Sequence, residues 1–240
     1  MQSFDVIRRR AAERKGGDDV LKALLPAMRT PEALAAVDDS RCLAEMTRCV
    51  FQAGFVWRVI NQKWEGFEAV FHGFDVGAIL RLTPDEWDGI ATDARIVRNG
   101  QKISSVRVNA RFIEDIAIEH GSFARFIADW PSIDLVGLFE LLKKRGSRLG
   151  GNTGQRFLRN VGKDTFVLST DVVRCLRESG VEIADNPGSK RDMARIQETF
   201  NAWHVETGLP YAHLSRIAAF SVGENHPPEI ILRNSSGAAP

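Results

Sequence analysis

Glycine placement between residues 141 and 180 constrains the fold of this chain most strongly. A basic helix end stops at Gly146, and the segment Gly150–Gly154 is too rich in glycine to continue a helix. Helical spacing of apolar residues then returns before a second glycine stop, at Phe157, Leu158 and Val161. The stretch therefore predicts two short helices joined by a tight turn, which together form a helical hairpin.

This hairpin is a candidate binding site for a polyanion. A turn at the start of a helix presents backbone N–H groups, and the helix dipole favours an anion there. The chain has a net charge of only +1, yet seven cations follow one another in this segment without an acid: Lys143, Lys144, Arg145, Arg148, Arg156, Arg159 and Lys163. A solvated basic face is the alternative. The glycine turn favours nucleic-acid backbone binding, with these candidate contacts: Arg148, Gly151, Asn152, Thr153 and Arg156.

Composition limits the class of protein. A chain of 240 residues with 44% hydrophobic content can bury a core. Three scattered cysteines are too few for a disulfide framework, so we expect a cytoplasmic protein. No apolar run approaches the ~20 residues that cross a bilayer, so no membrane association is expected. Strand patterns are scarce, and we therefore expect an all-α protein.

The two ends of the chain also read as helices. Apolar spacing predicts a helix at Phe4–Lys15, and Thr30 followed by proline predicts another helix start. Towards the C-terminus we expect helices at Lys190–His204 and Pro210–Phe220. Residues 223–240 read as an irregular tail rich in proline, serine and glycine.

A series of short motifs lies between the N-terminal helices and the hairpin. In order they are Gln52-Ala53-Gly54 with Trp57, Phe71 and Phe74-Asp75, Ile96-Val97-Arg98-Asn99 with Lys102-Ile103, and Asn109-Ala110-Arg111. The basic segment Leu142–Gly146 continues the series. Taken with the hairpin, this order resembles the DNA-3-methyladenine glycosylase I family of the helix-hairpin-helix DNA glycosylases. The resemblance covers about half of the chain.

The resemblance implies an overall organisation. It implies the helix-hairpin-helix DNA glycosylase fold, all-α, with two helical lobes around a base-binding cleft. We expect a single globule over residues 1–222, with one lobe from about 1–40 plus 165–222 and the other from 41–164. It further implies a monomer without an obligate protein partner, acting on double-stranded DNA that carries an alkylated base.

The resemblance assigns roles to the segment after residue 51. Trp57 matches the tryptophan that stacks on a flipped base, which would suit a cationic purine. Gln52 and Gly54 belong to the turn that enters the space left by that nucleotide, with Phe55 as an apolar wedge. The alternatives are a core tryptophan and a helix corner with Phe55 buried.

Cys49 departs from the family pattern. The family has a base-recognising glutamate at this position, whereas a thiol is a weak and neutral hydrogen-bonding partner. Glu45 lies one helical turn earlier and offers a carboxylate about 6 Å further along the axis. Glu45 is therefore either a substitute for the missing acid or an ordinary structural glutamate.

The chemistry implied is hydrolysis without strand cleavage. Ser169 stands where most helix-hairpin-helix glycosylases have an aspartate, and the 3-methyladenine branch also lacks that acid. Asp171 is either a substitute or only a partner of the helix dipole. Gln155 occupies the place of the lysine that forms a Schiff base in bifunctional members, so no strand cleavage is expected.

The remaining polar residues are candidates either for phosphate contacts or for structural hydrogen bonds. Arg98 and Lys102 are candidate phosphate contacts, and Arg111 either joins them or pairs with Glu114. Asn109 reads as a structural hydrogen-bonding residue. The cysteine and histidine residues by which the family binds zinc are not matched here, so we expect neither a metal nor a cofactor.

Two functions follow from these observations. The first is a DNA repair enzyme, a monofunctional glycosylase that flips a 3-methyladenine-like purine and hydrolyses its N-glycosidic bond. The second is a catalytically impaired relative that recognises damaged or distorted duplex through the hairpin. A helical protein-interaction domain would leave the basic clusters without a role.

Overall fold

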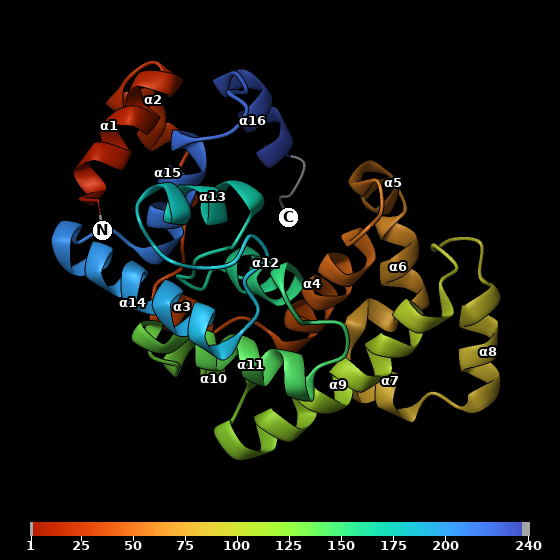
Figure 1. Cartoon of the computed structure of the whole chain (residues 1–240). Coiled ribbons are helices and arrows are strands. Elements are labelled where there is room, and N and C mark those ends of the chain that lie inside the picture. The colour runs from red at the N-terminus through yellow and green to blue at the C-terminus, as the bar shows by residue number, and fades with distance from the viewer. Residues whose placement is uncertain (1, 237–240) are drawn as a thin grey trace. The chain divides into compact units, whose positions relative to one another are not determined.

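The computed structural model describes residues 2–236, and this part of the chain contains helices and no β-strand (Figure 1). The all-α fold class predicted from the sequence is therefore confirmed. The described helices fall into two compact units. The first unit comprises residues 1–28, 131–136 and 164–240, and the second comprises 29–130 and 137–163. Residues 29–40 thus belong with the second unit, whereas the sequence placed them in the first lobe.

The first unit packs its helices around stacked aromatic side chains. Phe166 and Phe200 stack with ring centroids 4.4 Å apart, and Phe4 lies 5.1 Å from Trp203. These rings are fully buried. The helices of this unit are α1 (Phe4–Lys15), α2 (Asp18–Ala23), the short η2 (Ser132–Asp134), α13 (Thr170–Glu178), α14 (Lys190–Thr207), α15 (Tyr211–Ser221) and α16 (Pro228–Ser236).

Local signals place the ends of these helices close to their predicted positions. Ser3 caps α1 by accepting from the backbone N–H of Asp5, and Gly16 ends it in the left-handed conformation with φ 93°. The predicted helix Phe4–Lys15 is confirmed. The helices predicted near Lys190 and Pro210 are confirmed as α14 and α15, each within three residues at either end.

The prediction of an irregular tail is wrong in part, because α16 occupies Pro228–Ser236. Proline at the first helical position followed by Glu229 in the first turn is a helix start, which the preceding prolines and asparagines obscured. Before α16 the chain is tied to the end of α1. Arg14 donates to the carbonyls of Phe220 and Gly223 at 2.9 and 2.7 Å. Residues 237–240 of the predicted tail lie outside the described residues.

The second unit is built on two long helices, α4 and α9, which pack against each other. α4 buries an apolar stripe formed by Leu43, Met46, Val50 and Phe51. The helices of this unit are α3 (Pro31–Ala35), α4 (Asp39–Gln52), α5 (Trp57–Gln62), α6 (Trp64–Val70), η1 (His72–Phe74), α7 (Val76–Arg81), α8 (Pro84–Thr92), α9 (Gly100–His120), α10 (Phe123–Asp129), most of α11 (Leu135–Arg145) and α12 (Asn152–Asn160).

The predicted hairpin is formed by α11 and α12. Its turn is fixed to α9 by Asn109, whose side chain accepts from the Ser147 N–H at 2.7 Å and donates to the Ser147 carbonyl at 3.2 Å. The structural role predicted for Asn109 is thus confirmed. A Cβ at Gly154 would clash with the carbonyl oxygen of Leu149, so the two parts of the hairpin approach too closely for any side chain there.

The turn itself is shorter than the sequence predicted. Asn152, Thr153 and Gly154 were expected outside the helix, but they form the first turn of α12. Gly151 makes the reversal instead, with φ 57° and ψ −140°, a conformation that glycine adopts far more readily than other residues.

Candidate base-binding site and hairpin

The α4–α5 corner presents two large apolar side chains to solvent. Gly54 has φ 72°, and the Phe55 N–H donates to the Gln52 carbonyl at 3.1 Å, which closes a tight turn. Phe55 is 41% exposed, and Trp57, the first residue of α5, is 46% exposed. Both alternatives that buried these residues are therefore wrong. Exposed aromatic rings at a glycine turn are typical of a surface that contacts a ligand.

The buried side chain of Gln52 stabilises this corner. Its amide donates to the side-chain oxygen of Asn61 on α5 at 3.1 Å. This bond joins the end of α4 to α5 and fixes the position of Trp57. The substrate-binding role expected of Gln52, in the turn that enters the space left by the flipped nucleotide, stays a prediction.

Lys102 supports the same corner, and its predicted phosphate contact is wrong. The residue is 7% exposed, and its ammonium group donates to the carbonyls of Phe51 and Ala53 at 3.1 and 2.7 Å. Burial, with a smaller effect from Arg148, lowers the pKa of Lys102. The group also lies 4.9 Å from the centre of the Phe55 ring. Lys102 therefore caps α4 and holds the turn rather than contacting solvent.

Arg156 occupies one face of the exposed indole. Its guanidinium carbon lies 4.7 Å from the centre of the Trp57 ring, within cation–π range. The two residues come from α12 and α5, 99 positions apart in the sequence, and both belong to the second unit. The structure brings Arg156 to the indole of Trp57, and its predicted phosphate contact stays a prediction.

Glu45 and Cys49 face the same helix α12. The Cys49 thiol donates to Glu45 Oε1 at 3.4 Å, and the Asn160 amide donates to the same oxygen at 2.7 Å. Arg48 lies 3.9 Å from the other oxygen of Glu45. Asn160 was not predicted. Only its position one turn after Arg156 could have indicated that it shares this face.

Burial raises the pKa values of both Cys49 and Glu45. Cys49 is 4% exposed, and burial together with the nearby Glu45 carboxyl raises the pKa of its thiol well above the ordinary value. The thiol is therefore neutral at physiological pH. Burial also raises the pKa of Glu45, an effect opposed by the hydrogen bond from Asn160 and the charge of Arg48. Glu45 therefore holds its proton more tightly than a solvent-exposed glutamate does.

The N-terminus of α12 is open, as the sequence predicted for an anion site. No side chain caps it, and its first turn contains no acid. Asn152 is exposed and Thr153 is half-buried. Arg148, with φ 61°, is exposed and donates to Gln101 on α9, and Arg98 is exposed before the same helix. These groups are placed where a phosphate backbone could reach them.

Asp171 belongs to the first unit, so the site above is built without it. Ser169 caps α13 by accepting from the Val172 N–H at 3.3 Å, and Asp171 follows in the first turn. The Asp171 carboxylate lies against Gly223, where a Cβ would clash with it. A role for Asp171 in catalysis stays a prediction.

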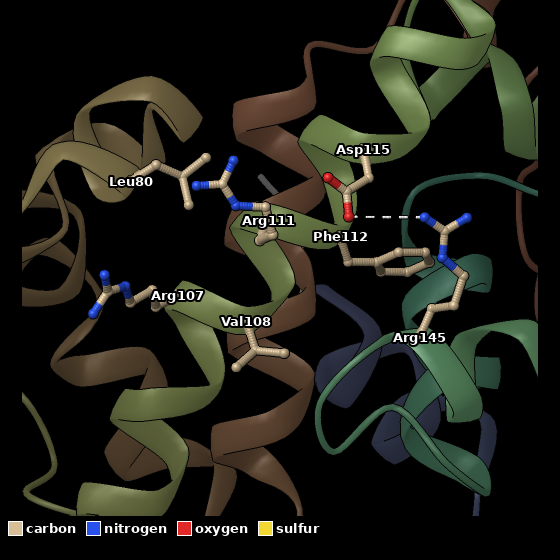
Figure 2. Close-up of a pocket in the computed structure, with 7 residues that line it drawn as sticks. All are labelled: Leu80, Arg107, Val108, Arg111, Phe112, Asp115 and Arg145. Carbon is tan, nitrogen blue, oxygen red and sulfur yellow. Dashed lines mark ion pairs between the residues drawn. The ribbon is translucent and has the colours of Figure 1, made fainter.

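A separate hollow lies along α9 (Figure 2). Figure 2 shows Arg145 directed at Asp115, with which it pairs at 3.8 Å, and Arg111 directed towards Leu80. Arg111 pairs with Glu114, one of the two alternatives left open by the sequence. Of the cations named from the sequence, Arg111 and Arg145 line the hollow, and each forms an ion pair, so much of its positive charge is compensated.

Residues 2–236 also bear on two other classes of site. No group of three or more metal-ligating side chains is present in this part of the chain. Nor does any described helix combine the length and the apolar character that crossing a membrane requires.

Comparison with known proteins relates part of the candidate site to a family. Residues 33–135, which include Glu45, Cys49 and Trp57, match the methyladenine glycosylase family. The match covers less than half of the chain. The hairpin residues Arg156 and Asn160 lie beyond the matched methyladenine glycosylase segment, although they contact it.

Two 3-methyladenine glycosylases are similar to parts of this chain. DNA-3-methyladenine glycosylase 1 of Escherichia coli (strain K12) is 35% identical over 75 residues, which is 30% of this chain. The chain spans only 40% of the length of that methyladenine glycosylase. The 3-methyladenine DNA glycosylase I of Staphylococcus aureus is 24% identical, with a TM-score of 0.46 over 52% of this chain and 77% of that one.

A more distant structure shows the fold over most of the chain. The 8-oxoguanine glycosylase/lyase of Methanocaldococcus jannaschii, solved with DNA, is 16% identical, with a TM-score of 0.55 over 92% of this chain and 99% of that one. The chain thus has the fold of a helical DNA glycosylase over most of its length. The predicted helix-hairpin-helix glycosylase fold is confirmed.

Proposed function

We propose that this protein is a monofunctional DNA glycosylase that flips an alkylated, 3-methyladenine-like purine out of duplex DNA and hydrolyses its N-glycosidic bond. The observation that carries the proposal is the exposed indole of Trp57 at a tight turn, with the Arg156 guanidinium over its ring. An extrahelical base gains its binding energy by stacking on such a ring.

The surrounding elements fit the steps of base flipping. Phe55 projects from the turn next to the indole and can fill the space left by the flipped nucleotide. The uncapped N-terminus of α12 and the exposed Arg98 and Arg148 can hold the phosphate backbone on either side.

Hydrolysis at this site relies on binding rather than on a strong nucleophile. The Cys49 thiol is neutral and donates to Glu45, so it is a poor nucleophile. Gln155 is buried and its amide cannot form a Schiff base, which supports hydrolysis without strand cleavage. An alkylated purine leaves readily, and stabilising its flipped state lowers the barrier.

The test is product analysis with the purified full chain and a duplex that contains N-methylated purines. The expected product is a free methylated purine, with strand breaks appearing only after treatment with alkali. Strand breaks without alkali would contradict the monofunctional mechanism, and the absence of any released purine would contradict the enzymatic function.

A second function is favoured by one specific observation. The carboxyl group of Glu45 is already engaged by Asn160 and Arg48. If no base is released, preferential binding of damaged duplex would identify the protein as a catalytically impaired DNA-binding relative. Such binding weakens with salt because phosphate contacts release counterions.

The remaining properties are part of the same proposal. We propose a monomer that acts without a cofactor or an obligate protein partner. The three cysteines are buried and free, in agreement with a reducing compartment, and cytoplasmic localisation stays a prediction.

A further inference from the structure

The ammonium group of Lys102 contacts both the backbone and the side chain of the turn that carries Phe55. It donates to the carbonyls of Phe51 and Ala53 at the end of α4, at 3.1 and 2.7 Å. The same nitrogen lies 4.9 Å from the centre of the Phe55 ring, within cation–π range. Because an ammonium has three N–H donors, two serve the backbone of the turn and one remains for the face of the ring.

The positive charge of Lys102 is stabilised by the turn itself. The residue is 7% exposed. Burial lowers the pKa of Lys102, Arg148 lowers it further, and no acid in the described part of the chain opposes these effects. The two carbonyls and the Phe55 ring are therefore the groups that stabilise the buried ammonium. A turn with another conformation would leave this charge buried without partners, which is costly.

The first turn of α9 fixes Lys102 in place. Asn99 caps this helix, and its side chain accepts from the Lys102 backbone N–H at 3.1 Å. The neighbouring residue Gln101 accepts from Arg148, an exposed cation of the hairpin turn and a candidate phosphate contact. A single helical turn thus contacts both the turn that carries Phe55 and the hairpin. Such a rigid element can fix the position of Phe55 relative to the phosphate contacts.

Resting on the proposed function, in which Phe55 fills the space left by a flipped nucleotide, we propose that Lys102 is the positioning residue for this apolar wedge. Lys102 fixes the backbone before Phe55 through two carbonyls and fixes the ring through its charge. An exposed side chain that is ordered only on binding weakens the affinity, because its conformational freedom is lost at that moment. A ring that is already oriented avoids this loss. Lys102 therefore strengthens binding to a duplex with a vacant base position without contacting the DNA.

The test compares the affinity of the full chain for two duplexes of the same sequence, measured by fluorescence anisotropy. One duplex contains a stable abasic-site analogue, which offers the space that the wedge fills, and the other is undamaged. The ratio of the two dissociation constants measures the preference for the abasic duplex. Phosphate contacts and the folded fraction of the protein affect both duplexes alike, so a purely structural role of Lys102 would not change this ratio.

Lys102→Met keeps the aliphatic length of the side chain and removes its charge. We expect this variant to lower the preference for the abasic duplex about three- to tenfold, as the loss of a cation–π contact implies. An unchanged preference in the folded variant overturns the proposal. Lys22→Met is the matched control, because it is the same substitution at an exposed position of α2, and it should keep the wild-type preference. An equal loss in this control would also overturn the proposal.

A double variant assigns the effect to Phe55. Phe55→Ala should lower the same preference at least threefold, and adding Lys102→Met should lower it no further, because Lys102 acts through this side chain. A further loss in the double variant overturns the proposal. If Lys102→Met does not fold, Phe55→Leu decides, since it keeps an apolar side chain and removes the ring that faces the ammonium. A preference at least threefold lower in Phe55→Leu supports the proposal, and an unchanged one overturns it.

These measurements separate this inference from the proposed activity, because neither duplex contains an alkylated base to be released. A protein that releases no purine can still show a preference that depends on Lys102, which supports the inference while the proposed activity fails. An active glycosylase whose preference does not depend on Lys102 overturns only the inference.

Discussion

The ammonium group of Lys102 closes the end of α4 by donating to two backbone carbonyls, those of Phe51 and Ala53. A buried carbonyl left without a donor costs about 1–3 kcal/mol. Replacing Lys102 by Met keeps the aliphatic length and removes both bonds. We predict that Lys102→Met lowers the free energy of unfolding by about 1–3 kcal/mol, measured by urea denaturation.

The same variant should leave the salt dependence of duplex binding unchanged, because Lys102 makes no phosphate contact. Arg98→Gln is the matched control. It removes an exposed cation before the same helix and should reduce the slope of log affinity against log salt by about one. A reduced slope in Lys102→Met together with unchanged stability would contradict the structural role.

Glu45 should make stability depend on pH in a defined direction. Burial raises its pKa in the folded state above the ordinary value of 4.5, so the folded protein holds this proton more tightly than the unfolded chain. The cost of ionising Glu45 is absent below pH 4.5 and fully present above the raised pKa. Its contribution to stability therefore falls as pH rises through that interval.

The variant Glu45→Gln removes this titration while retaining an acceptor for Asn160. We predict that its free energy of unfolding, relative to wild type, is higher at pH 8 than at pH 4, as measured by urea denaturation at both values. The difference between the two proteins isolates Glu45 from other titrating groups. A difference that does not vary with pH would show that the folded and unfolded pKa values are equal.

At the scale of elements, the hairpin depends on the close approach of α12 to the preceding turn and to α11. A Cβ at Gly154 would clash with the carbonyl oxygen of Leu149 and meet Leu142 Cδ1 at 3.3 Å. Gly154→Ala should therefore cost about 1–3 kcal/mol of stability and weaken duplex binding at least tenfold. Denaturation and fluorescence anisotropy with labelled duplex measure the two effects.

Gly150→Ala is the control in the same turn. Its Cβ would meet only the flexible Lys143 side chain, at 3.4 Å, and its φ is not in the left-handed region. Stability should change by less than about 0.5 kcal/mol. If Gly150→Ala and Gly154→Ala lost the same amount of stability, the clash at Gly154 would not be the cause of the loss, and this prediction would be contradicted.

Local sequence patterns predicted where the helices lie better than they predicted which residues the helices contact. Glycine stops and apolar spacing predicted α1, α14, α15 and the hairpin because helix ends are set within a few residues. The first turn of α12 was missed because Gly154 serves packing there and not flexibility. The α16 helix was missed because neighbouring prolines and asparagines also indicate a turn.

Long-range contacts explain what the sequence did not predict in the site. Lys102 reads as a surface cation because nothing near it in the chain reveals the carbonyls of Phe51 and Ala53. Trp57 meets Arg156, and Glu45 meets Asn160, across about a hundred residues or more. Spacing within one helix contains no information about such pairs, whereas the exposed corner at Phe55 and Trp57 followed from the family motif.

At the scale of the whole molecule, the segment that precedes α16 is tied to the end of α1. Lys15 is buried and donates to Asn225 Oδ1 and to the His226 carbonyl at 2.8 and 2.9 Å. We predict that Lys15→Met lowers the melting temperature by about 2–10 °C, since it removes ~1–3 kcal/mol of hydrogen bonding. Adding EDTA to the wild-type protein should leave the melting temperature unchanged. A fall in EDTA would mean that a bound metal stabilises the fold.

The account depends on a purine stacking on Trp57 during base release. The most direct measurement is the single-turnover rate of purine release from methylated duplex by wild type and by Trp57→Ala, with duplex affinity measured in parallel. The predicted result is a rate at least a hundredfold lower in the variant, with duplex affinity reduced less than about threefold, because the hairpin contacts remain. A Trp57→Ala variant that releases purine at the wild-type rate would contradict the account.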